Sequence, residues 1–335
     1  MAASAATVEL VLSIDVEEEG LFRGAYARRN PSVRNVAELM RLSPILEEFD
    51  LPVSLLCTHS VFADAAACRV LADMCARRRV EIGAHLHHWN TPPLGADSAA
   101  GQGYESPGRL PETLLAARVA SLFAAGRTFL GKPLTSFRMG KWDLHRRHWP
   151  LLAEAGVLVD ASVRPLHYAA HGPDHFDAPG DPYVVPVRGR AILEAPLTCM
   201  PLCACLRRLR PSSGVGGVRR RLAASVQKWG VLALLPAYHP LWVMQAVTKR
   251  RLTQGGRVLS LTWHSSEMMP GATPHLPDAP AVERFLEKIR SYLRWLTGWA
   301  AVQGRTLDEL RQTWNTENSG LRPGRVGVAG GDWRY

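Results

Sequence analysis

The 335-residue sequence lacks the patterns that mark several common classes of enzyme. It contains no Gly-x-Ser-x-Gly segment, so a serine nucleophile on a strained turn has no support. The glycine loops of P-loop and dinucleotide-binding proteins are also missing. With 47% hydrophobic residues, the chain is not disordered, collagen-like or a small disulfide-stabilised scaffold. Its length fits one large α/β barrel or two ordinary domains.

Cysteine is scarce, with 6 residues, and the first ten positions contain no basic residue. The apolar stretch at 8–14 is interrupted by Glu9 and followed by Asp15, which does not fit a secretory signal. We therefore expect a cytoplasmic protein with reduced thiols. The one cysteine cluster, whose spacing is unusual for a zinc site, comprises Cys199, Cys203 and Cys205.

Positive charge is concentrated in one region. Over the whole chain, 40 Lys and Arg residues outnumber 30 Asp and Glu residues, a formal net charge of +10. Between Pro186 and Arg257 there are thirteen Lys and Arg residues and a single acid, Glu194. One interpretation of such a region is a solvated loop. The other is a surface that attracts the phosphate groups of a membrane, a nucleotide-linked substrate or a nucleic acid. We expect no nucleic acid partner, because no recognition helix or aromatic single-strand motif accompanies the charge.

Residues 229–248 contain no charged side chain, yet they do not predict a membrane span. Pro236, His239 and Pro240 divide this run into a short strand and the start of a helix. Each piece is too short to cross a bilayer. A helix lying in the membrane interface remains an alternative.

Short apolar runs alternate with longer amphipathic segments, which is typical of parallel strands connected by helices. The pattern predicts strands at 8–14, 52–57, 80–84, 134–137, 157–161, 192–198, 231–235 and 258–263. It predicts helices at 33–49, 61–78, 112–130, 144–155, 241–253, 281–296 and 306–313. We expect a single catalytic domain over residues 1–314, with a basic insertion around 199–230 and a flexible tail at 315–335.

Four of the predicted strands end in polar residues of catalytic type. In chain order these residues are Asp15, Glu17, His85, His87, Arg138 and His264. Because the carboxyl ends of parallel barrel strands face one mouth, we expect the side chains to converge there. Side chains alternate along a strand, so the two carboxylates share one face and the two histidines share another.

Two imidazoles and one carboxylate suit a divalent metal ion that keeps open positions for water and a substrate oxygen. We therefore expect His85 and His87, together with one of the two carboxylates Asp15 and Glu17, to form a metal site with Zn²⁺ as the bound ion. Arg138 is placed to pair with a carboxylate and orient it. His264 is placed to protonate a leaving group.

These residues, in this order, resemble the polysaccharide deacetylase superfamily, whose members are also known as NodB-homology or carbohydrate esterase 4 proteins. The resemblance extends from residue 10 to residue 296 and is carried by segments 14–17, 81–85, 137–140, 159–162 and 263–271. It implies an α/β fold with a distorted (β/α) barrel of about seven parallel strands. It also implies a single zinc or similar divalent ion and hydrolysis of an N-acetyl group from an amino sugar.

Position by position, the resemblance implies a role for each residue. Asp15 would be the base that activates water, and Arg138 would orient it. Glu17 and His85 would be metal ligands, and His264 would be the acid that protonates the departing amine.

The sequence departs from the family at two positions. The family usually has Asp where this chain has Glu17, and Glu18 is an alternative ligand. The second histidine of the family lies four residues after the first, where this chain has Trp89. By strand alternation His87 takes its place, and the alternatives are His88 and Asn90.

We expect substrate contacts from side chains in the same segments, namely Trp89, Asn90, Trp142 and Glu267. The expected substrate is an acetylated amino sugar on a glycolipid, lipid-linked or nucleotide-linked glycan, with peripheral contact to the anionic inner face of a membrane. Two alternatives remain open. One is a metal-independent hydrolase of cyclic amide or ureide C–N bonds on the same fold, and the other is a glycan-binding protein without catalysis. The sequence leaves the oligomeric state open.

Overall fold

The computed structural model describes residues 7–95, 104–169, 172–203, 205–206 and 230–318. Its strands are β1 (Val8–Val16), β2 (Val53–Cys57), β3 (Val80–Leu86), β4 (Ser136–Met139), β5 (Val159–Asp160), β6 (Tyr183–Val187), β7 (Arg190–Glu194), β8 (Cys199–Pro201), β9 (Val231–Ala233), β10 (Val258–His264) and β11 (Val302–Arg305). Its α-helices are α1 (Ser43–Glu48), α2 (His59–Phe62), α3 (Ala65–Arg77), α4 (Glu112–Leu130), α5 (Trp149–Glu154), α7 (Leu241–Thr253), α8 (Ala279–Trp299) and α9 (Leu307–Asn318). Short 3₁₀ helices include Leu21–Arg23, Arg34–Leu42, Gly140–Trp142 and Ser265–Met268.

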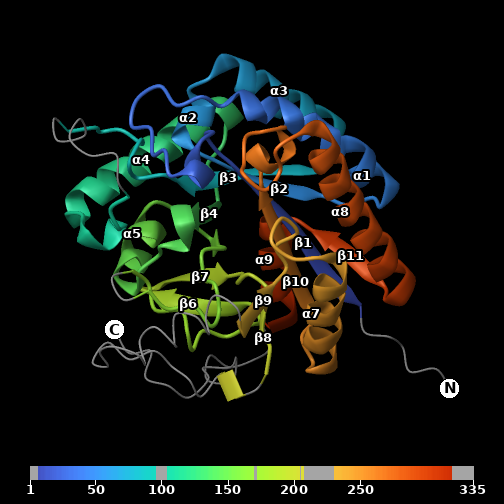
Figure 1. Cartoon of the computed structure of the whole chain (residues 1–335). Coiled ribbons are helices and arrows are strands. Elements are labelled where there is room, and N and C mark those ends of the chain that lie inside the picture. Colours follow the sequence, from blue (N-terminus) through green and yellow to red (C-terminus); the bar gives the residue numbers. More distant parts are fainter. Residues whose placement is uncertain (1–6, 96–103, 170–171, 204, 207–229, 319–335) are drawn as a thin grey trace, which may run out of the picture.

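A curled, mostly parallel sheet forms the centre of the molecule, and helices surround it (Figure 1). Within the described residues, seven strands pair in parallel in the order β10, β1, β2, β3, β4, β5 and β7. The antiparallel β6 ends this path, so the sheet is an open half-barrel. The expected α/β fold with a distorted barrel of about seven parallel strands is confirmed in this open form.

The central strands are buried because both faces of the sheet are covered. All of β1 from Leu10 to Val16 is buried, as is the whole of β2, which explains their nearly continuous apolar sequences. On the concave side, Leu307 and Leu310 of α9 pack in one cluster with Val11 of β1 and Leu56 of β2. This packing leaves the carboxyl ends of the strands as the accessible end of the half-barrel.

The apolar helix α4 packs against the sheet. Among the described helices, α4 is the one that could span a membrane by length and composition alone. Its Leu115, Val119 and Leu122 are buried, and the helix packs against β3 and α2. These contacts are those of a helix that covers a sheet with one apolar face.

The structure differs from the expected elements mainly after residue 180. The edge strand β6 contains Pro186, which lacks a backbone N–H and so weakens a strand pattern in sequence. β9 pairs with the unexpected β8 in a separate two-stranded sheet, and β11 is an additional short strand beside β1. The uncharged run is divided into β9 and α7, as expected. Most of the expected basic insertion (207–229) and of the expected tail (319–335) lies outside the described residues.

One expectation about the cysteines is wrong. Cys203 and Cys205, whose Cα atoms lie 5.5 Å apart, form a disulfide. This separation lies within the range that a disulfide spans. The other four cysteines are free thiols, as expected: Cys57, Cys68, Cys75 and Cys199.

Candidate metal centre

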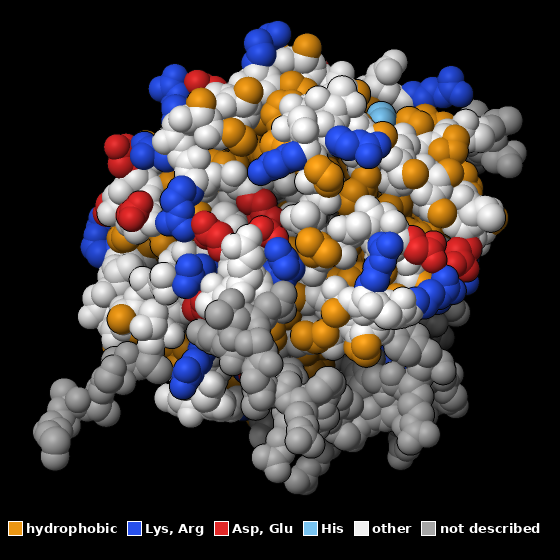
Figure 2. Space-filling view, turned by 180° about the vertical axis from the view of Figure 1, so that it is seen from behind, with side chains coloured by type: hydrophobic (Ala, Val, Ile, Leu, Met, Phe, Trp, Pro, Cys, Tyr) orange, Lys and Arg blue, Asp and Glu red, His pale blue; other side chains and the backbone are white. Residues whose placement is uncertain are grey.

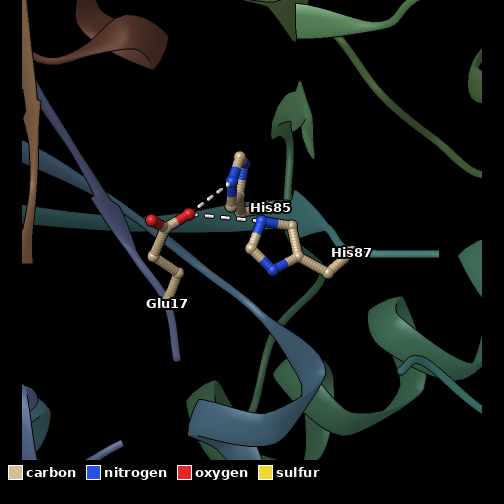
Figure 3. Close-up of side chains that lie close together, drawn as sticks. All are labelled: Glu17, His85 and His87. Atoms are coloured by element: carbon tan, nitrogen blue, oxygen red, sulfur yellow. Dashed lines mark ion pairs between the residues drawn. The ribbon is translucent and has the colours of Figure 1, made fainter. Parts of the chain in front are cut away.

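Glu17, His85 and His87 bring three ligand atoms together at the carboxyl ends of β1 and β3 (Figure 3). The Oε2 atom of Glu17 lies 3.3 Å from Nε2 of His85 and 3.2 Å from Nε2 of His87. Atoms about 2.1 Å from a tetrahedrally coordinated ion lie about 3.4 Å apart, so this spacing fits a zinc-like ion. Across the residues that the structure describes, this is the one group of three or more His, Cys, Asp or Glu side chains with metal-binding geometry.

Both histidines are fixed by hydrogen bonds at their Nδ1 atoms. Nδ1 of His85 lies 3.1 Å from the carbonyl oxygen of Arg138. Nδ1 of His87 lies 2.9 Å from each carboxylate oxygen of Glu18. When Nδ1 donates its proton in these contacts, Nε2 of each ring presents a lone pair to the centre. Metal-binding histidines in proteins are commonly oriented in this way.

Glu18 lies behind His87, and the two residues after His88 hold it there. Nε1 of Trp89 donates to Oε1 of Glu18 at 3.1 Å, and Nδ2 of Asn90 donates to the same oxygen at 2.6 Å. The Trp89 ring also stacks on the His87 ring with centroids 4.1 Å apart. The structure therefore places Trp89 and Asn90 as buried supports of His87, and their expected contact with substrate stays a prediction.

The alternative ligands from the sequence point elsewhere. Glu18 and Asn90 form a hydrogen bond with each other, as described above. Nε2 of His88 lies 2.8 Å from the carbonyl oxygen of Glu105, away from Glu17. Trp89 stands where the family has its second histidine, and His87 presents the imidazole instead because it follows His85 by two residues, the repeat of a strand.

The charges of the centre favour an ionised carboxylate next to protonated imidazoles. Burial alone would raise the pKa of Glu17, but His264, His85 and His87 together hold it well below its usual range. Burial lowers the pKa of His87, yet Glu18 and Glu17 outweigh this effect and raise it to about 9. A metal ion and a proton therefore compete for Nε2 of His87.

Asp15 lies beside the three ligands and is held by Arg138. Nη1 of Arg138 donates to Oδ1 of Asp15 at 2.5 Å and to Thr262 at 3.0 Å. The rest of the guanidinium donates to Ser13 at 2.8 Å and to the carbonyl oxygen of Ala161 at 2.9 Å. Both charged side chains are buried. These bonds fix the carboxylate so that its other oxygen faces the centre.

His264 lies next to Oδ2 of Asp15, the carboxylate oxygen that faces the centre. It is paired in register with Asp15, and its Nε2 atom lies 3.8 Å from Oδ2 of Asp15. Oε2 of Glu267 accepts from the backbone N–H of His264 at 2.8 Å and lies 3.1 Å from its Nδ1. Burial lowers the pKa of His264, but Glu17, Glu267 and Asp15 raise it to about 10. The imidazole is therefore a proton donor at neutral pH.

Glu267 and Trp142, two of the expected substrate contacts, also support neighbouring groups. The second oxygen of Glu267 lies 3.0 Å from Nε2 of His275. Trp142 is buried and lies over Arg138, with 4.6 Å from the guanidinium carbon to the ring centre. Their contact with substrate stays a prediction.

Sequence reasoning missed residues beside His264 and residues of a cavity that none of the three ligands lines. The ring of Phe22 meets the rings of His264 and His275 edge-on at 4.9 and 5.5 Å. Tyr104 and Lys141 line a cavity of about 520 Å³ together with Asp143 and His167. Lys141 adjoins the segment 137–140 that the sequence analysis singled out, whereas no local pattern marks Phe22, Tyr104 or His275.

No family model matches this sequence, and a comparison with curated proteins finds no match. Solved structures with the same fold do exist. A structure named as a polysaccharide deacetylase from Mycobacterium smegmatis has a TM-score of 0.58 and 16% identity, covering 95% of this chain and 96% of that one. A second structure named as a polysaccharide deacetylase, from Pseudomonas aeruginosa PAO1, has a TM-score of 0.54 and 13% identity. The match covers 92% of this chain and 91% of that one. An allantoinase has a TM-score of 0.55 and 14% identity, covering 94% and 92%.

The chain thus shares its fold with solved structures named as polysaccharide deacetylases, which is the fold that the resemblance in sequence implies. The allantoinase shows that proteins with another name share this fold. Because one fold serves several functions, the chemistry has to be argued from the residues of the site.

Proposed function

We propose that the chain is a metal-dependent hydrolase that removes the N-acetyl group from an amino sugar, with Zn²⁺ as its metal ion. One observation carries the proposal. The ligand group of Glu17, His85 and His87 lies next to a carboxylate held by a buried arginine, and the imidazole of His264 lies across from that carboxylate. Amide hydrolysis needs a base, an acid and a group that withdraws charge from the carbonyl, and this arrangement offers all three.

Each side chain has a role that follows from its position. Glu17, His85 and His87 would hold the ion, which supplies a Lewis acid for the acetamide carbonyl and makes water more acidic. Oδ2 of Asp15 accepts a proton from the attacking water, because Arg138 occupies its other oxygen. His264 donates a proton to the amine nitrogen as the C–N bond breaks, with Glu267 fixing its ring. The products are acetate and the free amino sugar.

The proposed substrate carries its sugar on a lipid or a nucleotide, on the cytoplasmic side of a membrane. The basic region between Pro186 and Arg257 supports this proposal, because both carriers present phosphate groups.

The test is acetate release from a panel of free, nucleotide-linked and lipid-linked N-acetylated amino sugars. Zinc-loaded wild type is compared with chelated protein and with Asp15→Asn. We expect one acetate per free amine produced, with loss of activity after chelation and in the variant. Hydrolysis of cyclic amides or ureides that persists after chelation would instead support the metal-independent hydrolase. Glycan binding by the zinc-loaded wild type without acetate release would support the non-catalytic protein.

A further inference from the structure

Exposed aromatic side chains gather on one side of the molecule, around α7 and the end of α8. The described residues include six exposed large hydrophobic side chains, and four of them lie there: Leu202, Tyr238, Trp242 and Trp299. Trp242 is 68% exposed, Leu202 61% and Tyr238 54%. Single exposed apolar residues are ordinary, but a group of this kind marks a contact surface.

We call the outer surface of α7 and of the end of α8 the α7–α8 face, and contacts link its two helices. Trp295 stacks on Trp299 with ring centroids 5.5 Å apart, and Nζ of Lys249 lies 5.7 Å from the Trp295 ring centre. Trp242 precedes Lys249 by seven residues, so both project from the same side of α7. The face thus combines indole rings with an ammonium group.

The charge on and around this face is positive. α7 contains Lys249, Arg250 and Arg251 and no acidic residue. Arg251 is buried and pairs with Asp181, whereas Arg250 is half-buried and Lys249 is exposed. On the face seen from behind in Figure 2, by contrast, Lys and Arg side chains lie among Asp and Glu side chains.

A longer basic segment starts and ends beside the same face. The backbone N–H of Leu202 donates to the carbonyl of Gly230 at 2.7 Å, and Arg250 donates to the carbonyls of Pro201 and Leu202. Between Leu206 and Gly230 the sequence has seven cations and no acid: Arg207, Arg208, Arg210, Arg219, Arg220, Arg221 and Lys228.

We propose that the α7–α8 face docks on an anionic lipid bilayer. Tryptophan and tyrosine prefer the interface between water and lipid, and Lys and Arg are attracted to anionic headgroups. An aromatic patch surrounded by cations fits this partner better than it fits a neutral or basic protein surface. The anionic lipid headgroup is the chemistry that the cations recognise.

This face continues into the mouth of the metal centre. The Tyr238 ring lies 5.4 Å from the His275 ring, and His275 contacts the carboxylate that orients His264. Docking would therefore bring the mouth to the edge of the bilayer. Resting on the proposed function, this position favours an amino sugar whose carrier is a lipid that stays in the membrane.

The test is co-sedimentation of the full chain with vesicles of phosphatidylcholine, with and without phosphatidylglycerol, at low and high salt. We expect binding to the anionic vesicles alone, and weaker binding at high salt. Trp242→Ala weakens it about tenfold, because a large apolar side chain no longer enters the interface. Lys249→Gln weakens it about fivefold. The matched controls Leu158→Ala and Lys132→Gln, which change exposed residues elsewhere, bind as wild type does.

Two results would overturn the docking proposal. One is the absence of vesicle binding at low salt. The other is binding that Trp242→Ala and Lys249→Gln leave unchanged, which would assign it to another surface. The assay measures no catalysis, so it fails separately from the proposed function. A chain that releases acetate from soluble sugars but ignores vesicles refutes docking alone, and a chain that binds vesicles but never releases acetate refutes the deacetylase alone.

Discussion

The Nδ1 atom of His87 lies 2.9 Å from both carboxylate oxygens of Glu18. This contact accounts for a ligand histidine at an unusual spacing from His85. A buried imidazole needs a fixed orientation to bind a metal ion, and Glu18 provides it with help from Trp89 and Asn90. Consecutive carboxylates in one turn therefore have different tasks: Glu17 faces the centre and Glu18 orients its ligand.

Glu18→Gln should weaken zinc binding about 10- to 100-fold, because outer carboxylates orient metal ligands and raise their basicity. The measurement is a competition titration against a chromophoric chelator at neutral pH. Glu19→Gln is the control, since Glu19 contacts the backbone of Asn35 and the side chain of Arg34 and touches no histidine. Equal zinc affinity in Glu18→Gln and wild type would show that Glu18 does not support the site.

The metal content of three histidine variants shows whether His87 or His88 is the second histidine ligand. We expect close to one divalent ion per chain in wild type and its loss in both His85→Ala and His87→Ala. His88→Ala should keep the ion, because its ring contacts the carbonyl oxygen of Glu105. Elemental analysis of purified protein measures this. Metal retained in His87→Ala but lost in His88→Ala would mean that the loop after β3 rearranges around the ion.

The sequence predicted the positions that depend on regular structure. Asp15, His85, Arg138 and His264 stand at the ends of parallel strands, and the register of those strands brings them together. The role of Glu18 was not predicted, because β1 ends at Val16 and the strand repeat no longer says where the next side chains point. The contact of His275 with Glu267 could not be predicted either, because it depends on a loop whose sequence has no periodicity.

The fold, too, was predictable only where the sequence has a regular apolar pattern. Apolar runs predicted β1, β2, β3 and β10 because these strands are buried on both faces. The edge strand β6 and the short β8 have no such signal, because buried and exposed residues mix in β6 and β8 has only 3 residues. Their pairing is decided by contacts distant in sequence, which a single sequence does not display.

Asp15→Asn should separate chemistry from metal binding. The variant keeps the side-chain shape and the three ligands, so its zinc content should equal that of wild type. Acetate release should fall on the order of 10²- to 10⁴-fold, because the amide accepts no proton from water. Steady-state rates and elemental analysis of the same preparation measure both quantities. A variant that retains wild-type activity would remove Asp15 from the proposed reaction.

Arg138→Met should destabilise the fold by about 3 to 5 kcal/mol, since it leaves the buried Asp15 without its cation. Combining it with Asp15→Asn removes that unpaired charge, so the double variant should be more stable than Arg138→Met alone. Urea unfolding of the four proteins at one pH measures the free energies. If the two changes simply add, the ion pair is not what Arg138 contributes to stability.

Two buried histidines should make the protein less stable in mild acid. Burial, reinforced by His145 and Arg147, lowers the pKa of His148 from 6.5 to about 3, and burial lowers that of His175 from 6.5 to about 4. Below pH 6.5 the unfolded chain binds protons at these sites and the folded chain does not, so unfolding becomes easier as the pH falls toward 4. Each histidine then costs about 1.4 kcal/mol of unfolding free energy per pH unit.

Replacing His148 with Gln tests this linkage, because Gln is polar and does not titrate. The expected result is a smaller fall in unfolding free energy between pH 6.5 and pH 4.5 than in wild type, whatever the change in stability at neutral pH. His175→Gln should act in the same direction, although it also alters the hydrogen bond to the carbonyl of Leu144, and so it adds a constant loss at every pH. The slope of unfolding free energy against pH separates the loss of titration from the loss of the hydrogen bond, since only a titrating group changes that slope. An unchanged slope in both variants would mean that other groups carry the acid sensitivity and that these histidines are protonated in the folded chain.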